Sequence, residues 1–131
     1  MNRILLVDDE PFFNSALTEY LQINGFEVSS ASNGNEAIRI LNSVKKFDIV
    51  ITDIIMPDKD GIELILYMKA KFPETKIIAI SGGGRISPAN YLYIASVFKV
   101  NGTILKPFSF HELEEKMNEL TLATLQIPKK L

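Results

Sequence analysis

Strand-like and helix-like segments alternate five times along this chain of 131 residues, and that alternation constrains the fold more than any other feature. The strand-like segments are short and mostly hydrophobic. The segments between them repeat apolar side chains at the three- and four-residue spacing of one helix face. The pattern predicts strands at about 3–7, 27–30, 48–52, 77–80 and 102–105, and helices, counted from their capping residues, at about 11–24, 33–41, 61–72, 87–98 and 109–125.

Strands that alternate with helices imply a parallel sheet covered on both faces, because each crossover lays a helix against the sheet. Right-handed crossovers then place the first strand beside the third at the centre. We therefore expect an α/β fold with a doubly wound, five-stranded parallel sheet, flavodoxin-like (βα)5, in strand order 2-1-3-4-5. No linker or repeat leads to a second domain, so residues 1–125 are expected to form one domain and residues 126–131 a short C-terminal tail.

Composition excludes several other classes of protein. The chain is 47% hydrophobic with a net charge of -2, which fits neither a disordered segment nor a basic nucleic-acid-binding surface. It has no cysteine, hence no disulfide framework and no thiolate metal site. The apolar run before Asp8 is too short for a signal peptide or a membrane span. We expect a soluble, cytoplasmic protein that binds neither membrane nor nucleic acid directly.

Residues suited to charge and phosphate chemistry stand where four of the predicted strands end. Asp8 and Asp9 follow the first strand, Asp53 the third, Ser81 the fourth and Lys106 the fifth. In an open α/β sheet, ligands bind outside the carboxyl ends of the strands. We therefore expect these five side chains to converge on one site.

Three carboxylates in one site repel one another, and two unit charges ~4 Å apart cost about 4 kcal/mol at an effective dielectric of about 20. A bound cation relieves this repulsion, and Mg²⁺ suits a site with few protein oxygens because it keeps several waters and completes its shell with phosphate. Lys106 adds an ammonium and Ser81 a hydroxyl. Metal, ammonium and hydroxyl are what a transferring phosphoryl group requires. Asp53, at the end of the central strand, is the predicted nucleophile.

Four motifs carry a resemblance to a known family. With them, the chain resembles the receiver domain of two-component response regulators over nearly its whole length. The motifs are Val7-Asp8-Asp9-Glu10, the segment from Asp53 to Gly61, Ser81-Gly82 and Lys106-Pro107-Phe108.

The resemblance implies a stand-alone phosphoaccepting switch of a phosphorelay. Asp53 would take a phosphoryl group from a phosphohistidine of a sensor histidine kinase or a histidine phosphotransfer protein, and the phosphorylated form would change its binding to a downstream protein. Mg²⁺ would be bound by Asp9, by Asp53 and by the backbone carbonyl of Ile55, with Asp8 acting through water. Such a domain is not an enzyme beyond slow self-dephosphorylation. The family's Lys-Pro bond, here Lys106-Pro107, is usually cis.

The chain departs from the family on the side that usually signals. The aromatic residue expected three positions before the lysine is Thr103, and the Gly-Ala pair that usually precedes it is Lys99-Val100. A threonine is too small to fill the space an aromatic residue would take. We therefore expect phosphorylation to reorder the glycine-rich loop at 82–87 and the start of the following helix.

Two other functions stay open. One is a receiver-like scaffold that binds partners without phosphorylation, which the departure at Thr103 favours. The other is a Mg²⁺-dependent phosphatase with an aspartyl nucleophile. That class usually carries a second aspartate two residues after the nucleophile, where this chain has Ile55.

Overall fold

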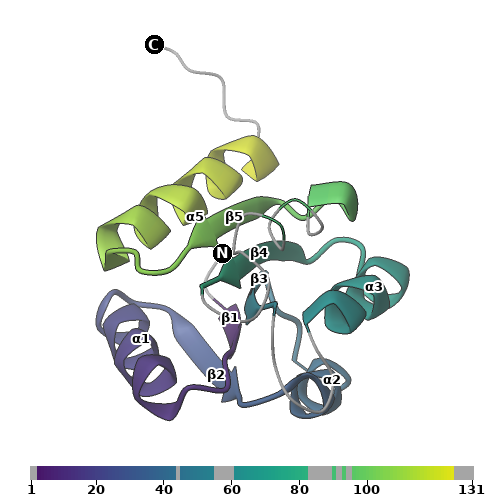
Figure 1. Ribbon diagram of the computed structural model, residues 1–131, viewed down its shortest axis with the longest axis horizontal. Helices are drawn as coiled ribbons and strands as arrows, with labels where there is room; N and C mark the ends of the chain where they lie inside the picture. Colours follow the sequence, from purple (N-terminus) through teal and green to yellow (C-terminus); the bar gives the residue numbers. More distant parts are fainter. Residues whose placement is uncertain are drawn as a thin grey trace.

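The computed structural model describes residues 3–43, 45–54, 61–82, 90, 93 and 96–125, the last five by their backbone alone. Five parallel strands form one sheet in the order β2-β1-β3-β4-β5, with α1 and α5 on one face and α2 and α3 on the other (Figure 1), so the predicted fold class and strand order are confirmed. The elements are β1 (Arg3–Val7), α1 (Pro11–Ile23), β2 (Glu27–Ala31), α2 (Gly34–Leu41), β3 (Ile49–Asp53), α3 (Gly61–Lys71), β4 (Lys76–Ser81), β5 (Gly102–Leu105) and α5 (Phe110–Leu125).

The helix predicted at 87–98 lies largely outside the described residues. Within this range the structure gives helical backbone to Asn90, Tyr93, Ser96 and Val97. In the part of the chain that is described, we find no helix with both the length and the apolar character that a membrane crossing requires.

Local signals in the sequence fix where the helices begin. Asn33 caps α2 by accepting a hydrogen bond from the Glu36 amide at 2.8 Å. The Glu36 carboxylate accepts from the Ser32 amide at 2.7 Å, one residue before the cap. At α5 the Ser109 hydroxyl accepts from the Glu112 amide, and the Glu112 carboxylate accepts from the Ser109 amide. The bonds to the Glu36 and Glu112 amides satisfy backbone donors that the first helical turn leaves without a partner, and the return bonds satisfy the amides of Ser32 and Ser109 just before it.

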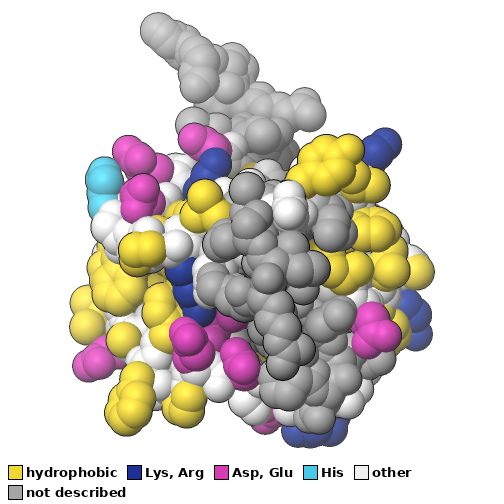
Figure 2. All heavy atoms as spheres, viewed as in Figure 1, with side chains coloured by type: hydrophobic (Ala, Val, Ile, Leu, Met, Phe, Trp, Pro, Cys, Tyr) yellow, Lys and Arg dark blue, Asp and Glu magenta, His cyan; other side chains and the backbone are white. Residues whose placement is uncertain are grey.

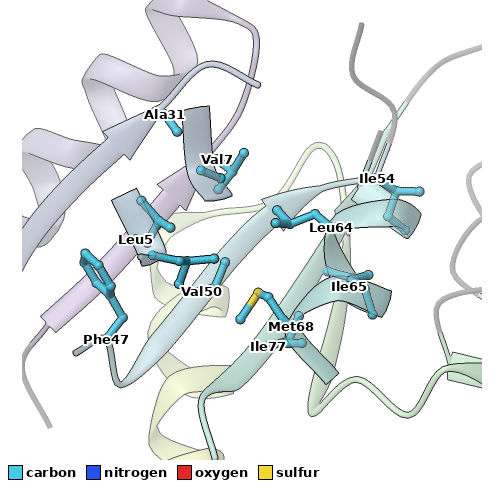
Figure 3. Packing of buried hydrophobic residues seen from close by; sticks show 13 residues of the cluster. Leu5, Val7, Ala31, Phe47, Val50, Ile54, Leu64, Ile65, Met68 and Ile77 are labelled. Carbon is cyan, nitrogen blue, oxygen red and sulfur yellow. The ribbon is translucent and has the colours of Figure 1, made fainter. Parts of the chain in front are cut away.

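Alternating side chains of the sheet supply two hydrophobic clusters, one under each helical layer. Residues on one face of the strands pack against α2 and α3 (Figure 3), where Val50 and Ile77 meet Leu64 and Met68. Residues on the other face, including Ile51, pack against α1 and α5. Every residue of β3 is buried. The central strand is therefore held on both faces and at both edges, which makes it a rigid base for groups at its end.

The strand register brings the carboxyl ends of the strands to one edge of the sheet. Val7 of β1 lies opposite Thr52 of β3, and Asp53 lies opposite Ile80 of β4. Ser81 in turn lies opposite Leu105, the last residue of β5. The residues at or just beyond these positions are thus neighbours in space although they are far apart in the sequence.

Candidate functional site

The backbone at this edge is tied together beyond the regular strand pairing. The Asp8 amide donates to the Ala31 carbonyl at 3.1 Å, and the Lys106 amide donates to the Ser81 carbonyl at 2.8 Å. The Ile54 amide, immediately after β3, donates to the Ile80 carbonyl at 3.0 Å. The side chains of Asp8, Asp53, Ser81 and Lys106 therefore start from fixed points at or just beyond the ends of four neighbouring strands.

Three carboxylates converge here as the sequence predicted. Asp8, Asp9 and Asp53 each offer an oxygen, and these oxygens lie within 4.8 Å of one another. Asp8 and Asp53 are buried, whereas Asp9 is exposed. Figure 2 shows acidic side chains next to a basic one near the centre of this face of the molecule. A hollow of about 260 Å³ borders Asp8 and Asp9 beside the start of α1.

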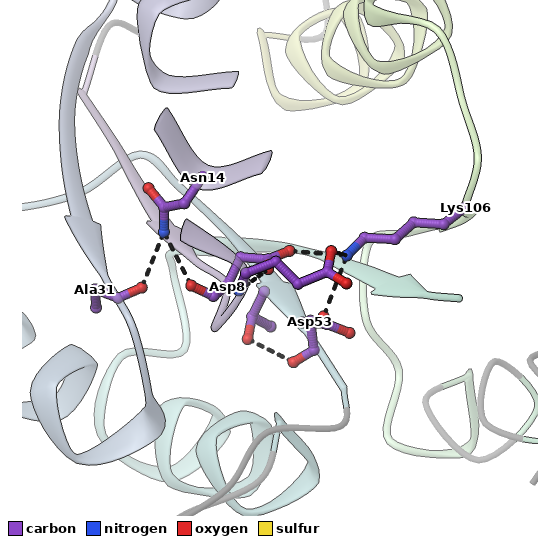
Figure 4. Close-up of polar contacts among 7 residues, drawn as sticks. Asp8, Asn14, Ala31, Asp53 and Lys106 are labelled. Carbon is purple, nitrogen blue, oxygen red and sulfur yellow. Dashed lines mark hydrogen bonds and ion pairs between the residues drawn. The ribbon is translucent and has the colours of Figure 1, made fainter. Parts of the chain in front are cut away.

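Among the described residues, Lys106 supplies the positive charge of the site. Its Nζ lies 3.1 Å from Asp8 Oδ2, 3.4 Å from Asp53 Oδ2 and 2.8 Å from Glu10 Oε1 (Figure 4). The ammonium also lies over the Phe13 ring, 4.4 Å from its centroid, which is within the range of a favourable cation–π contact. One ammonium is thus shared among three carboxylates and an aromatic face.

Burial controls how these groups titrate. It raises the pKa of Asp53 from 3.8 to about 6, more than the charge of Lys106 lowers it. Burial likewise raises the pKa of Asp8, although Asp8 accepts hydrogen bonds from the Glu10 amide and from Lys106. Burial alone would lower the pKa of Lys106, but the hydrogen bond to Glu10 and the charges of Asp53 and Asp8 raise it overall. At neutral pH the site therefore holds an ionised Asp53 beside a protonated Lys106.

Ser81 has a fully buried side chain, and its Oγ has no hydrogen-bond partner among the described residues. Leaving a buried hydroxyl unpaired costs about 1–3 kcal/mol. Such an atom at the edge of an anionic site is suited to donate to an oxygen that arrives with a ligand.

Two glycines are required by close approach. A Cβ on Gly82 would lie 2.1 Å from the Cβ of Lys106, and a Cβ on Gly61 would lie 2.2 Å from the carbonyl oxygen of Asp53. Neither neighbour is the free end of a flexible side chain, so neither can move aside easily. The glycines after Ser81 and at the start of α3 are therefore part of the construction of the site.

The charges of the site suit a divalent cation. Asp8, Asp53 and Glu10 contact Lys106, the one cation that the described residues bring to the site, and Asp9 adds a further carboxylate beside Asp8 and Asp53. The burial of Asp8 and Asp53 makes the uncompensated negative charge costly. The donors are all oxygen and few, which matches Mg²⁺ better than metals that need nitrogen or sulfur ligands.

A scan against protein-family models matches residues 4–118 to the response regulator receiver domain. The chain belongs to this family. The matched range includes the site residues described above, which lie at or just beyond the ends of β1, β3, β4 and β5. The receiver also has a cis Lys106-Pro107 bond, as the resemblance implied.

The chain covers very different shares of the curated relatives that it matches. The receiver is 38% identical over 86 residues to the chemotaxis protein CheY of Listeria monocytogenes, covering 65% of this chain and 71% of CheY. It is 32% identical over 118 residues to the sensor kinase CckA of Brucella abortus, covering 89% of this chain but 12% of the relative. It also spans 24% of the regulatory protein AtoC of Escherichia coli, at 31% identity over 113 residues.

Solved structures agree with the fold. A receiver domain protein of Clostridium thermocellum superposes with a TM-score of 0.85 at 26% identity, covering 97% of this chain and 100% of that one. The response regulator TrrA of Thermotoga maritima, solved with Mg²⁺ and beryllofluoride, superposes with a TM-score of 0.78 at 36% identity, covering 92% of this chain and 99% of that one.

Three residues of the site were missed or misjudged from the sequence. Asn14, a polar residue on the inner side of α1, donates from Nδ2 to the Asp8 carbonyl at 3.0 Å and to the Ala31 carbonyl at 3.2 Å. The motif Val7-Asp8-Asp9-Glu10 gives Glu10 no role of its own, and nothing in the sequence marks Phe13 as part of the site. Phe13 does pack against the α1–α5 cluster, but its ring also faces Lys106.

Other sequence predictions lie outside the described residues, including the carbonyl ligand Ile55 and the loop from 83 to 87. Thr103 is half-buried in β5, opposite Ala79.

Proposed function

We propose that this receiver is a phosphoaccepting switch of a two-component phosphorelay, with Asp53 as the residue that accepts the phosphoryl group. The observation that carries the proposal is the position of the Asp53 carboxylate. It is buried at the end of the central strand, 3.4 Å from an ammonium and within 4.8 Å of two further carboxylates that can share a cation.

The phosphoryl group would come from a phosphohistidine of a sensor histidine kinase or a histidine phosphotransfer protein. An Asp53 carboxylate oxygen forms a bond to phosphorus, the P–N bond breaks, and its electron pair returns to the imidazole nitrogen. Burial raises the pKa of Asp53 to about 6, so at neutral pH the carboxylate is still ionised and can act as the nucleophile.

Lys106 and Ser81 have defined roles in this reaction. The protonated Lys106 ammonium lies 3.4 Å from the Asp53 carboxylate and can donate a hydrogen bond to an oxygen of the arriving phosphoryl group. The Ser81 hydroxyl, which lacks a partner among the described residues, can donate to another of these oxygens. Both groups lie at or just beyond the ends of neighbouring strands, which holds their backbone in place during the reaction.

Mg²⁺ would be held by Asp9 and Asp53, with Asp8 in the outer part of its shell and the Ile55 carbonyl as a further ligand. When bound, it would neutralise charge on the phosphoryl oxygens. The TrrA structure, which carries Mg²⁺ with a beryllofluoride group, supports this assignment by similarity.

Phosphorylation would change binding to a downstream protein, with no direct contact to nucleic acid or membrane, in the cytoplasm. We assign residues 1–125 to the receiver and 126–131 to a tail. The chain would catalyse no turnover beyond slow self-dephosphorylation, because Ile55 and Gly83, which flank the expected path of water in the family, carry no side chain that could activate it.

Acetyl phosphate with Mg²⁺ tests the proposal by intact-protein mass. The wild-type chain should gain one phosphoryl group, whereas Asp53→Asn and an EDTA-treated sample should gain none. Asp9→Ala should weaken labelling far more than Glu74→Ala, which removes an exposed carboxylate between α3 and β4. Acetyl phosphate consumed without a mass gain would favour the phosphatase, and neither consumption nor gain would favour the scaffold.

A further inference from the structure

The ammonium of Lys106 has no hydrogen-bond donor to spare. An ammonium carries three N–H groups, and three carboxylates accept from it: Glu10 at 2.8 Å, Asp8 at 3.1 Å and Asp53 at 3.4 Å. The Phe13 ring lies 4.4 Å away and closes a further side. Any new acceptor at Lys106 must therefore take a place that a carboxylate holds now.

The three carboxylates differ in how readily they can release the ammonium. The Asp8 side chain is 0% exposed and that of Asp53 11%, whereas that of Glu10 is 62% exposed. A buried carboxylate that loses its cation is left without a partner, which is expensive. Water can replace the ammonium at Glu10. The shortest of the three contacts is thus also the one that can be given up at least cost.

We propose that Glu10 is a positioning residue that competes with the phosphoryl group for Lys106, so that phosphorylation releases the Glu10–Lys106 ion pair. The inference rests on the proposed function and adds to it a residue, Glu10, whose contact with Lys106 weakens the binding of the phosphoryl group. Two groups that compete for one ammonium oppose each other equally in both directions. Weakening the Glu10 contact must therefore strengthen the binding of a phosphoryl group.

Release of the Glu10–Lys106 ion pair would change the contacts at the start of α1. Glu10 is the N-cap residue of this helix, its amide donates to Asp8 Oδ1 at 2.8 Å, and its carbonyl accepts from the Asn14 amide at 2.9 Å. The Glu10–Lys106 pair joins this helix start to the end of β5, residues that are 96 positions apart in the sequence. This route from the phosphorylation site to the surface requires no aromatic residue at Thr103.

The test measures the dissociation constant of beryllofluoride, a phosphoryl analogue, at saturating MgCl₂ in four proteins: wild type, Glu10→Gln, Glu10→Asp and Glu19→Gln. An exposed ion pair is worth little, so we expect Glu10→Gln to bind about two- to five-fold more tightly than wild type. Glu10→Asp keeps the charge but shortens the side chain and is a good helix cap, so it should fold normally and also bind more tightly. Glu19→Gln removes the same charge from an exposed position on α1 and should match wild type.

Amide exchange at the first turn of α1 gives a second measurement on the same samples. Beryllofluoride should increase exchange there in the wild type and change it little in Glu10→Gln, where the contact is already weakened. If Glu10→Gln bound beryllofluoride no more tightly than wild type, the competition would be refuted and the proposed function would stand. If Glu10→Asp matched wild type while Glu10→Gln did not, charge alone would explain the effect and the role of the contact would be wrong. A wild-type protein that binds no beryllofluoride would overturn both proposals.

Discussion

Asp53→Asn should make the protein more stable at neutral pH while removing its proposed activity. Asparagine has nearly the same shape as aspartate but carries no charge to bury. A rise in pKa from 3.8 to about 6 corresponds to about 3 kcal/mol, because each tenfold change in proton affinity is worth about 1.4 kcal/mol. The pKa of about 6 already includes the attraction of Lys106, so this contact is not subtracted again, and we expect a net increase of about 1–3 kcal/mol in the free energy of unfolding.

The pH dependence separates this cause from better packing. A raised carboxyl pKa favours the protonated form in the folded state, so ionised Asp53 destabilises the fold fully above about pH 6 and hardly at all below 3.8. The advantage of Asp53→Asn should therefore be present at neutral pH and shrink as the pH falls through this range.

Urea unfolding of EDTA-treated protein at several pH values measures the effect, with Glu74→Gln as a control that removes an exposed carboxylate at the opposite edge of the sheet. Added Mg²⁺ should then stabilise the wild type more than Asp53→Asn, because the variant lacks a ligand. A variant no more stable than wild type at neutral pH, or a gain that persists unchanged at low pH, would refute the reasoning.

Two further substitutions test how the site is built. Gly82→Ala places a Cβ 2.1 Å from that of Lys106, so the lysine must shift, and acetyl phosphate labelling should slow by roughly a hundredfold; an unchanged labelling rate would show that Lys106 has freedom to move. Asn14→Ala removes the bonds to the Asp8 and Ala31 carbonyls at 3.0 and 3.2 Å, which should lower the unfolding free energy by about 1–3 kcal/mol in urea titration; no loss would mean that water replaces the amide without cost.

The convergence of the site could be predicted because parallel strands must end at a common edge. The hydrophobic runs locate the strands in the sequence. The polar residues that follow these runs must then lie close together, because the strands end at the same edge. Strand boundaries were less certain: β3 was predicted at 48–52 but spans Ile49–Asp53. Asp48 instead accepts a hydrogen bond from the Arg3 amide through its side chain, and Asp53 pairs with Ile80 within the sheet.

The sharing of Lys106 could not be predicted, since it depends on how far particular side chains reach. Glu10 follows two aspartates and looks like part of an acidic motif, yet it makes the shortest contact to the ammonium, at 2.8 Å. The sequence indicates Gly82 only as part of the Ser81-Gly82 motif and of the glycine-rich loop, and the structure adds that a Cβ at this position would meet the Cβ of Lys106. Asn14 lacks a sequence signal other than being polar on the inner side of an amphipathic helix.

The central claim is that the Asp53 carboxylate carries the phosphoryl group, and reductive trapping tests it most directly. Borohydride reduces an aspartyl phosphate to homoserine, which marks the residue permanently. After treatment with acetyl phosphate and Mg²⁺ followed by borohydride, peptide sequencing by mass spectrometry should find homoserine at position 53. Homoserine at another aspartate, or none in a protein that has gained a phosphoryl group, would contradict the account.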